Sequence, residues 1–184
     1  VYGVSWDGGA LYHPDERSIL MRAEQMHRTL SSEIGWQFSA NTDFPLDKPG
    51  LPGISTLLNA DRSPLNPHWF PLGSIIIYLL VGVRYFLDLF MDQVKIQDLA
   101  IAGRVLTSLV STISIFALYL LGKRVFGLSV GLLAAVLLTF SAIDIQISNF
   151  YRPEPFVAAL SLACFWYMLN IISRSHWRDH VLLG

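Results

Sequence analysis

The sequence predicts an all-α polytopic membrane protein, built from transmembrane helices and an extracytoplasmic loop with juxtamembrane amphipathic helices. Of its 184 residues, 53% are hydrophobic and only 15% are charged, whereas a soluble domain carries about 25% charged residues. The mean hydropathy is +0.46, and three uncharged runs are long enough to cross a bilayer. The net charge of -1 gives no basic field that would attract nucleic acid.

The first predicted element is an amphipathic helix over residues 14–30. Apolar residues recur there at helical spacing among charged ones: Ile19, Ala23, Met26 and Leu30. We expect this helix to lie along the membrane. A loop over residues 31–68 follows, rich in Pro, Gly, Asn and Asp, with turn signals at residues 47–50 and 52–53.

Residues 69–91 form a short apolar segment that two interpretations fit. The uncharged stretch ends at Val83, before Arg84 and Asp88, and is short for a membrane span. Short apolar helices flanked by charge and aromatics often lie at the membrane interface, and this interpretation is preferred. If the segment instead crossed the membrane, everything before it would be cytoplasmic.

The remaining elements are three predicted transmembrane helices. About 20 helical residues cross the hydrocarbon layer of about 30 Å. The uncharged runs cover residues 105–122, 125–143 and 155–173, each bounded by charged residues. The predicted helices cover residues 99–122, 125–147 and 153–173.

The chain is expected to be a piece of a longer protein. It starts with Val1, and residues 181–184 resemble the opening of another apolar segment. Residues 1–98 would then form the first extracytoplasmic loop, and residues 99–184 would belong to one larger catalytic transmembrane domain.

The orientation follows from the positive-inside rule, which places short loops rich in Lys and Arg in the cytoplasm. Lys123 and Arg124 lie between the first two predicted spans, and Arg174 and Arg178 follow the third. The loop over residues 144–154 is therefore extracytoplasmic, and so is the segment directly before Arg104.

The sharpest local motif is residues 13–16, where His13 and Pro14 precede the acidic pair Asp15 and Glu16. A purely structural interpretation explains it well, because proline suits the first helical position and acidic residues complement the helix dipole. A helix start also directs side chains into any cleft above it, so a functional interpretation stays open.

Two further candidates stand at predicted extracytoplasmic helix ends. One is Arg104, which is either a snorkelling anchor or a guanidinium that binds phosphate. The other is the stretch 151–154, which includes Arg152 and Glu154, although charge is ordinary at such a boundary.

Together these groups lie on one predicted side of the membrane. They suit the transfer of a sugar from a polyprenyl phosphate. Cations would hold the lipid-linked phosphate at the interface, while a carboxylate takes the proton of the acceptor hydroxyl.

Over nearly its whole length the sequence resembles the C superfamily of membrane glycosyltransferases, which includes protein O-mannosyltransferases and bacterial aminoarabinose transferases. Residues 13–16 resemble the acidic-pair motif of the family's first extracytoplasmic loop, and residues 66–73 stand where the family has a proline-rich motif before a juxtamembrane helix. Residues 102–106 and 120–127 are similar to the next span and its cytoplasmic end. Residues 145–154 resemble the loop that carries a second acidic residue.

The resemblance implies a role for each candidate. Asp15 would be the general base, with Glu16 supporting it and Glu154 positioning the acceptor or Asp15. Arg104 and Arg152 would bind the carrier phosphate, because Asn66, Pro67 and His68 stand where many relatives have a lysine before paired prolines. Glu154 replaces the more usual aspartate, which lengthens the reach of the carboxylate. Further candidates are His13, Arg17 and His68.

The scheme needs no cofactor beyond the lipid-linked sugar phosphate that serves as donor. His13, His27 and His68 lack zinc-ligand spacing, so no metal site is predicted, while a divalent cation stays open. The expected partners are the donor, membrane lipid, and a protein, glycan or lipid acceptor, but not nucleic acid. We expect a multi-pass protein of the plasma membrane with an extracytoplasmic active site, and a hexosyl- or pentosyl-type transferase that is inactive as this piece alone.

Two other classes of protein remain open. In a non-enzymatic transporter or lipid-handling protein, Arg104 and Glu154 would line a pathway. In a structural membrane subunit, substitutions of the charged candidates would alter only stability. Neither class requires an acidic pair at the head of an amphipathic helix, which favours the enzyme.

Overall fold

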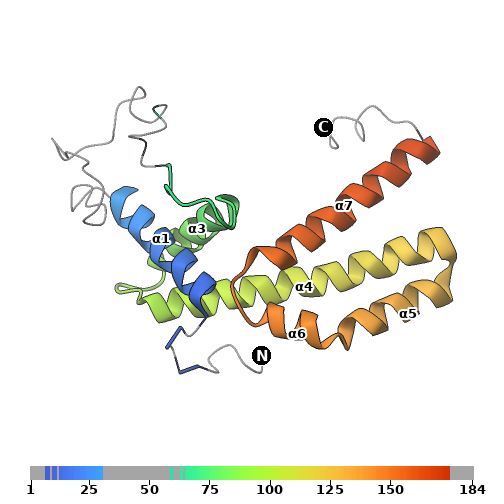
Figure 1. Ribbon diagram of the computed structural model, residues 1–184, viewed down its shortest axis with the longest axis horizontal. Coiled ribbons are helices and arrows are strands. Elements are labelled where there is room, and N and C mark those ends of the chain that lie inside the picture. The colour runs from blue at the N-terminus through green and yellow to red at the C-terminus, as the bar shows by residue number, and fades with distance from the viewer. Residues whose placement is uncertain are drawn as a thin grey trace. The chain divides into compact units, whose positions relative to one another are not determined.

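The computed structural model describes residues 7–8, 10–11, 13–30, 59, 63 and 65–174. These residues form helices and turns, with no strand among them (Figure 1). The helices are α1 (Pro14–Leu30), α3 (Ile75–Asp88), α4 (Ile96–Phe126), α5 (Leu128–Thr139), α6 (Ala142–Ser148) and α7 (Pro153–Arg174). The chain divides into two compact units, residues 5–103 and residues 104–184 with residues 1–4, and each is described by itself.

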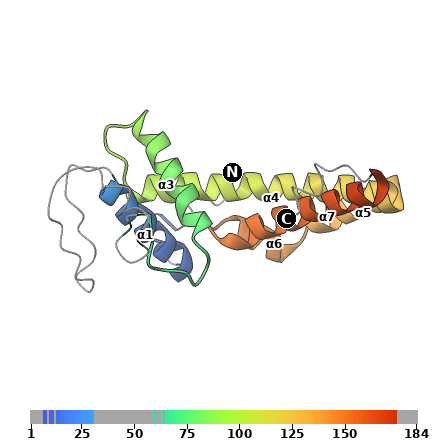
Figure 2. The same cartoon turned by 90° about the horizontal axis from the view of Figure 1, so that it is seen from above.

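In the first unit, α1 packs against α3 through a continuous apolar face. The two helices lie side by side in both views (Figures 1 and 2). Fully buried residues on this face are Ile19, Leu20 and Ala23 of α1, and Ile76, Ile77 and Leu80 of α3. Burial of each large apolar side chain contributes about 1.5–3 kcal/mol, so this face stabilises the helix pair.

A network of charged side chains joins the C-terminal halves of the same two helices. Arg84 of α3 donates to Glu24 of α1 at 3.1 Å and also pairs with Asp88, one turn further along α3. Asp88 in turn contacts Nε2 of His27 at 2.8 Å, and the His27 ring lies edge-on to Tyr85. The network therefore adds directional polar contacts between α1 and α3 to the non-directional packing of the apolar face.

Helix α3 is shorter than the segment predicted over residues 69–91. Its 14 residues correspond to about 21 Å, less than the hydrocarbon thickness of about 30 Å, so α3 is too short to span. Its outward face is apolar as well, with Ile75, Leu79 and Phe86 exposed. This combination favours the interfacial interpretation.

The second unit holds most of the transmembrane helices. Both α4, with 31 residues, and the stretch Pro153–Ile172 of α7, with 20, are long and apolar enough to cross a membrane. Helices α5 and α6 pass the same test only as a pair, because the chain bends by 60° between them. The described residues thus hold two helices that are able to cross a membrane, or three candidate spans if the bent pair is one.

The segment predicted as a transmembrane helix over residues 125–147 contains a bend between α5 and α6. Phe140 ends α5, and Ser141 takes an extended conformation with ψ of 113°. The Ser141 hydroxyl accepts a hydrogen bond from the Asp144 backbone N–H at 3.4 Å, and so caps α6. A serine side chain can replace regular helical hydrogen bonds in this way. A hydropathy profile does not detect this effect, so the bend was not predicted.

Helix α5 turns back alongside α4 (Figures 1 and 2), and a glycine contact brings the two backbones together. A Cβ added to Gly131 would lie 2.7 Å from the Tyr119 carbonyl oxygen and 2.6 Å from the Lys123 nitrogen. At Gly122 an added Cβ would lie 2.9 Å from Cα of Gly131. Small residues permit such close approach between membrane helices.

Arg124 fastens the end of α4 to α7. Its guanidinium donates to Oδ1 of Asn170 at 2.6 Å and to the Leu169 carbonyl oxygen at 3.2 Å. The same group lies over the Trp166 ring, 4.8 Å from the centroid. A residue predicted only as a topology signal thus also holds two helices together.

The predicted fold class is confirmed: this is an all-α polytopic membrane protein. Helix α1 has the expected bounds, and α4 begins earlier than expected. The turn signals at residues 47–50 and 52–53, Arg178, and the apolar segment at residues 181–184 lie outside the described residues.

Candidate functional site

The acidic pair lies in the first turn of α1, and its two carboxylates differ in their exposure to solvent. Pro14 is the first helical residue, and the His13 carbonyl oxygen accepts from the Arg17 backbone N–H at 3.0 Å. Glu16 is fully buried, because it continues the apolar stripe of Ile19 and Ala23. Asp15 is half-buried and Arg17 is exposed. Of the two carboxylates, Asp15 is the one with solvent access.

His68, another candidate of the first unit, has an unusual backbone conformation. His68 has a φ of +48°, and its N–H donates to Oδ1 of Asn66 at 2.9 Å. This turn precedes α3. Residues 66–68 therefore form a turn that has a structural role at the approach to α3.

Arg152 and Glu154 lie together at the start of α7 in the second unit. Their side chains form an ion pair, so a predicted phosphate-binding residue and the predicted second acidic residue contact each other. Oε2 of Glu154 is enclosed and accepts no hydrogen bond from the described residues. This oxygen could accept a hydrogen bond from a bound hydroxyl group.

Tyr151, directly before this pair, is fully buried and lies edge-on to Phe156, with 5.8 Å between the ring centroids. Burial raises the pKa of the Tyr151 phenol, so this side chain stays neutral and anchors the start of α7. Tyr151 belongs to the predicted stretch 151–154, but nothing in the sequence indicates that its side chain is buried.

Arg104 is 1% exposed and Thr107, one turn later on α4, is fully buried. The arginine is therefore enclosed by protein and does not snorkel toward water. A buried guanidinium is stable only with compensating acceptors or charges.

In the sequence, Arg84 and Asp88 indicate only the end of an uncharged stretch, and nothing there predicts their network with Glu24 and His27. Burial lowers the pKa of His27 below its ordinary value, and the neighbouring Arg84 acts in the same direction. The sequence does contain a signal for one ion pair of this network, because Arg84 and Asp88 are four residues apart on a predicted helix.

Among the described residues, no group of three or more His, Cys, Asp or Glu side chains could hold a metal ion. The structure brings Asp15 and Glu16 together at one helix start, with His13 and Arg17 beside them in the chain. It brings Arg152 and Glu154 together at another helix start. These two groups belong to separate units.

A protein-family model described as dolichyl-phosphate-mannose-protein mannosyltransferase matches residues 81–184. The match includes α4 to α7 and the candidates Arg104, Arg152 and Glu154, but it begins after α1 and so leaves out the acidic pair. Neither the comparison with curated proteins nor the comparison with solved structures gives a match.

Proposed function

Because the chain belongs to the dolichyl-phosphate-mannose-protein mannosyltransferase family, we propose that it moves a sugar from a polyprenyl phosphate to an acceptor hydroxyl or phosphate outside the cytoplasm. The family match is the observation that carries this proposal, and it confirms the resemblance to membrane glycosyltransferases. The site would face the extracytoplasmic side of the plasma membrane, as the positive-inside rule favours.

Asp15 is the proposed general base. Its support is its place in the first turn of α1 and its partial exposure, in contrast to the full burial of Glu16. A base must come within hydrogen-bond reach of the acceptor hydroxyl, which a fully buried carboxylate does not do. Glu16 would hold the start of α1 and so orient Asp15.

Arg152 and Glu154 would act as a pair that the donor separates. The carrier phosphate competes with Glu154 for the Arg152 guanidinium, since both anions suit its donors. Once released, Glu154 would position the acceptor through its carboxylate oxygens. Arg104 would stabilise the negative charge of the phosphate from its buried position on α4.

No cofactor enters this scheme, since the departing phosphate already carries the negative charge that accumulates as the glycosidic bond breaks. Cationic side chains aimed at that charge supply the electrostatic stabilisation. His13, Arg17 and His68 remain further candidates beside Asp15.

The test is Asp15→Asn in the full-length protein, assayed for sugar transfer from a lipid-linked donor. Loss of the base should lower the rate constant about 100- to 10,000-fold, while binding of the donor is retained. Asp92→Asn is the matched control, because Asp92 is exposed and stands before α4. Full transfer by the Asp15 variant would remove this residue from the mechanism.

A further inference from the structure

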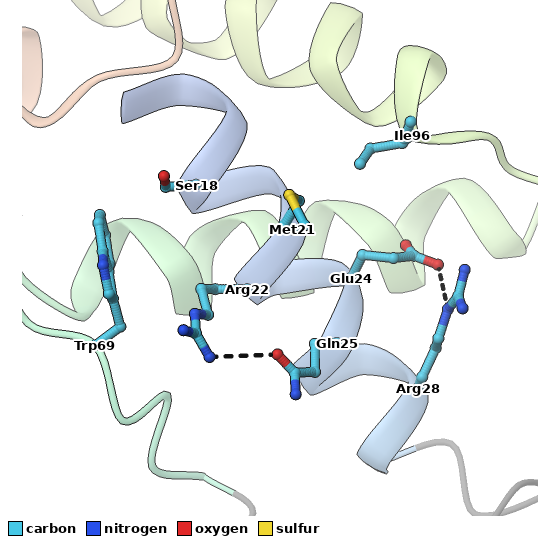
Figure 3. Close-up of a pocket in the computed structure, with 8 residues that line it drawn as sticks. All are labelled: Ser18, Met21, Arg22, Glu24, Gln25, Arg28, Trp69 and Ile96. Atoms are coloured by element: carbon cyan, nitrogen blue, oxygen red, sulfur yellow. Dashed lines mark hydrogen bonds and ion pairs between the residues drawn. The ribbon is translucent and has the colours of Figure 1, made fainter. Parts of the chain in front are cut away.

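The outward face of α1 borders a groove that the proposed transfer reaction does not use. The groove has a volume of about 490 Å³, and Figure 3 shows the side chains that surround it. They are Ser18, Met21, Arg22, Glu24, Gln25, Arg28, Trp69 and Ile96.

The groove carries a net positive charge, because its lining includes two arginines and a single carboxylate, Glu24. Oε1 of Glu24 accepts from Arg28 at 3.0 Å, and Oε2 accepts from Arg84 at 3.1 Å. Both oxygens are therefore occupied by guanidinium groups. Within the described part of the chain, Arg22 makes a long hydrogen bond of 3.4 Å to the neutral side chain of Gln25, as the dashed line in Figure 3 marks.

Apart from Ser18, the rest of the lining is apolar or aromatic. Met21 and Ile96 contribute aliphatic surface, and Trp69 contributes an indole ring with one N–H donor. A groove with guanidinium donors beside apolar walls is complementary to an amphiphile with an anionic group. Tryptophan and arginine are both typical of the membrane–water boundary.

The position of Ile96 relates the groove to the membrane. Ile96 is the first residue of α4, whose 31 residues make it long enough to span. Such a helix is about 46 Å long, close to the roughly 40–45 Å of a bilayer with both headgroup layers. The first residue of α4 therefore belongs at the level of the lipid headgroups.

From these contacts we propose that the groove binds the phosphate of an anionic membrane phospholipid. Arg22 and Arg28 hold the phosphate oxygens, and Met21, Trp69 and Ile96 contact the glycerol and the upper acyl chain. The bound lipid would fix α1 against the headgroup layer.

The probe is dihexanoyl phosphatidylglycerol, titrated into the full-length protein in detergent and counted by native mass spectrometry, with dihexanoyl phosphatidylcholine as the zwitterionic comparison. We expect the protein to retain the anionic lipid preferentially. Each of Arg22→Gln and Arg28→Gln should weaken its binding about fivefold, since one cation near a lipid surface contributes about 1 kcal/mol. Arg22→Lys, which keeps the charge, should restore most of the binding.

Lys123→Gln is the matched control, because it removes one exposed cation at the other end of α4. Equal retention of the two lipids, or equal weakening by Lys123→Gln, would overturn the proposal. Displacement of the lipid by millimolar inorganic phosphate would also overturn it, since the site would then serve a soluble anion. Sugar transfer is measured in a separate assay, so a negative result for lipid binding would not contradict the proposed function.

Discussion

At the scale of single residues, burial separates side chains that look equivalent in the sequence. Glu24 pairs with two arginines, of which Arg28 is 70% exposed and Arg84 is 11% exposed. An exposed ion pair is worth about 0–1 kcal/mol. Removing one partner of a buried pair costs about 3–5 kcal/mol, because the other charge stays buried without compensation.

We therefore predict that Arg84→Ala loosens the α1–α3 pair far more than Arg28→Ala. Hydrogen exchange of the α1 and α3 amides in the full-length protein measures this. Arg84→Ala should lower the local opening free energy by about 3–5 kcal/mol, and Arg28→Ala by less than about 1 kcal/mol. Equal protection in both variants would show that the network contributes little to the pairing.

At the scale of helices, close approach rather than hydropathy holds α4 to α5. Gly131 lies against the backbone of Tyr119 and Lys123, and a backbone cannot move aside as a side chain can. Apolar side chains gain nothing from leaving lipid for one another, so packing at such contacts drives the association of membrane helices.

Gly131→Ala should consequently destabilise the α4–α5 pair, because its Cβ would lie under 3.0 Å from backbone atoms. Overpacking of this kind costs about 1–3 kcal/mol, which a lowered unfolding temperature of the full-length protein in detergent would report. Gly82→Ala in α3 is the control, since its Cβ would meet nothing within 4 Å. A control variant as unstable as Gly131→Ala would refute the role assigned to the contact.

At the scale of the whole molecule, the proposed site requires the acidic pair to lie on the same side of the membrane as Arg152 and Glu154. The shortness of α3 supports this, because a segment that does not span leaves α1 on the side where α4 begins. The positive-inside rule predicts that Lys123 and Arg124 lie on the cytoplasmic side.

Sidedness can be measured with single cysteines in the full-length protein after the other cysteines are replaced. Ser18→Cys in α1 should react with a membrane-impermeant maleimide in intact cells. Lys123→Cys should react only after lysis. Labelling of Ser18→Cys only after lysis would separate Asp15 from Arg152 and Glu154, and the transfer mechanism would have to be abandoned.

Hydropathy and charge determined the helical membrane class and the presence of the apolar segments, because burial in lipid demands long uncharged runs. The helical spacing of apolar residues among charged ones predicted α1. The family resemblance likewise rested on local motifs. Other features depend on which distant residues meet. Tertiary structure alone decided that Glu16 faces inward, that Arg104 is enclosed and that Arg152 pairs with Glu154. It also decided that Arg84 joins Glu24, since a contact between residues 60 positions apart leaves no periodic signal in the chain.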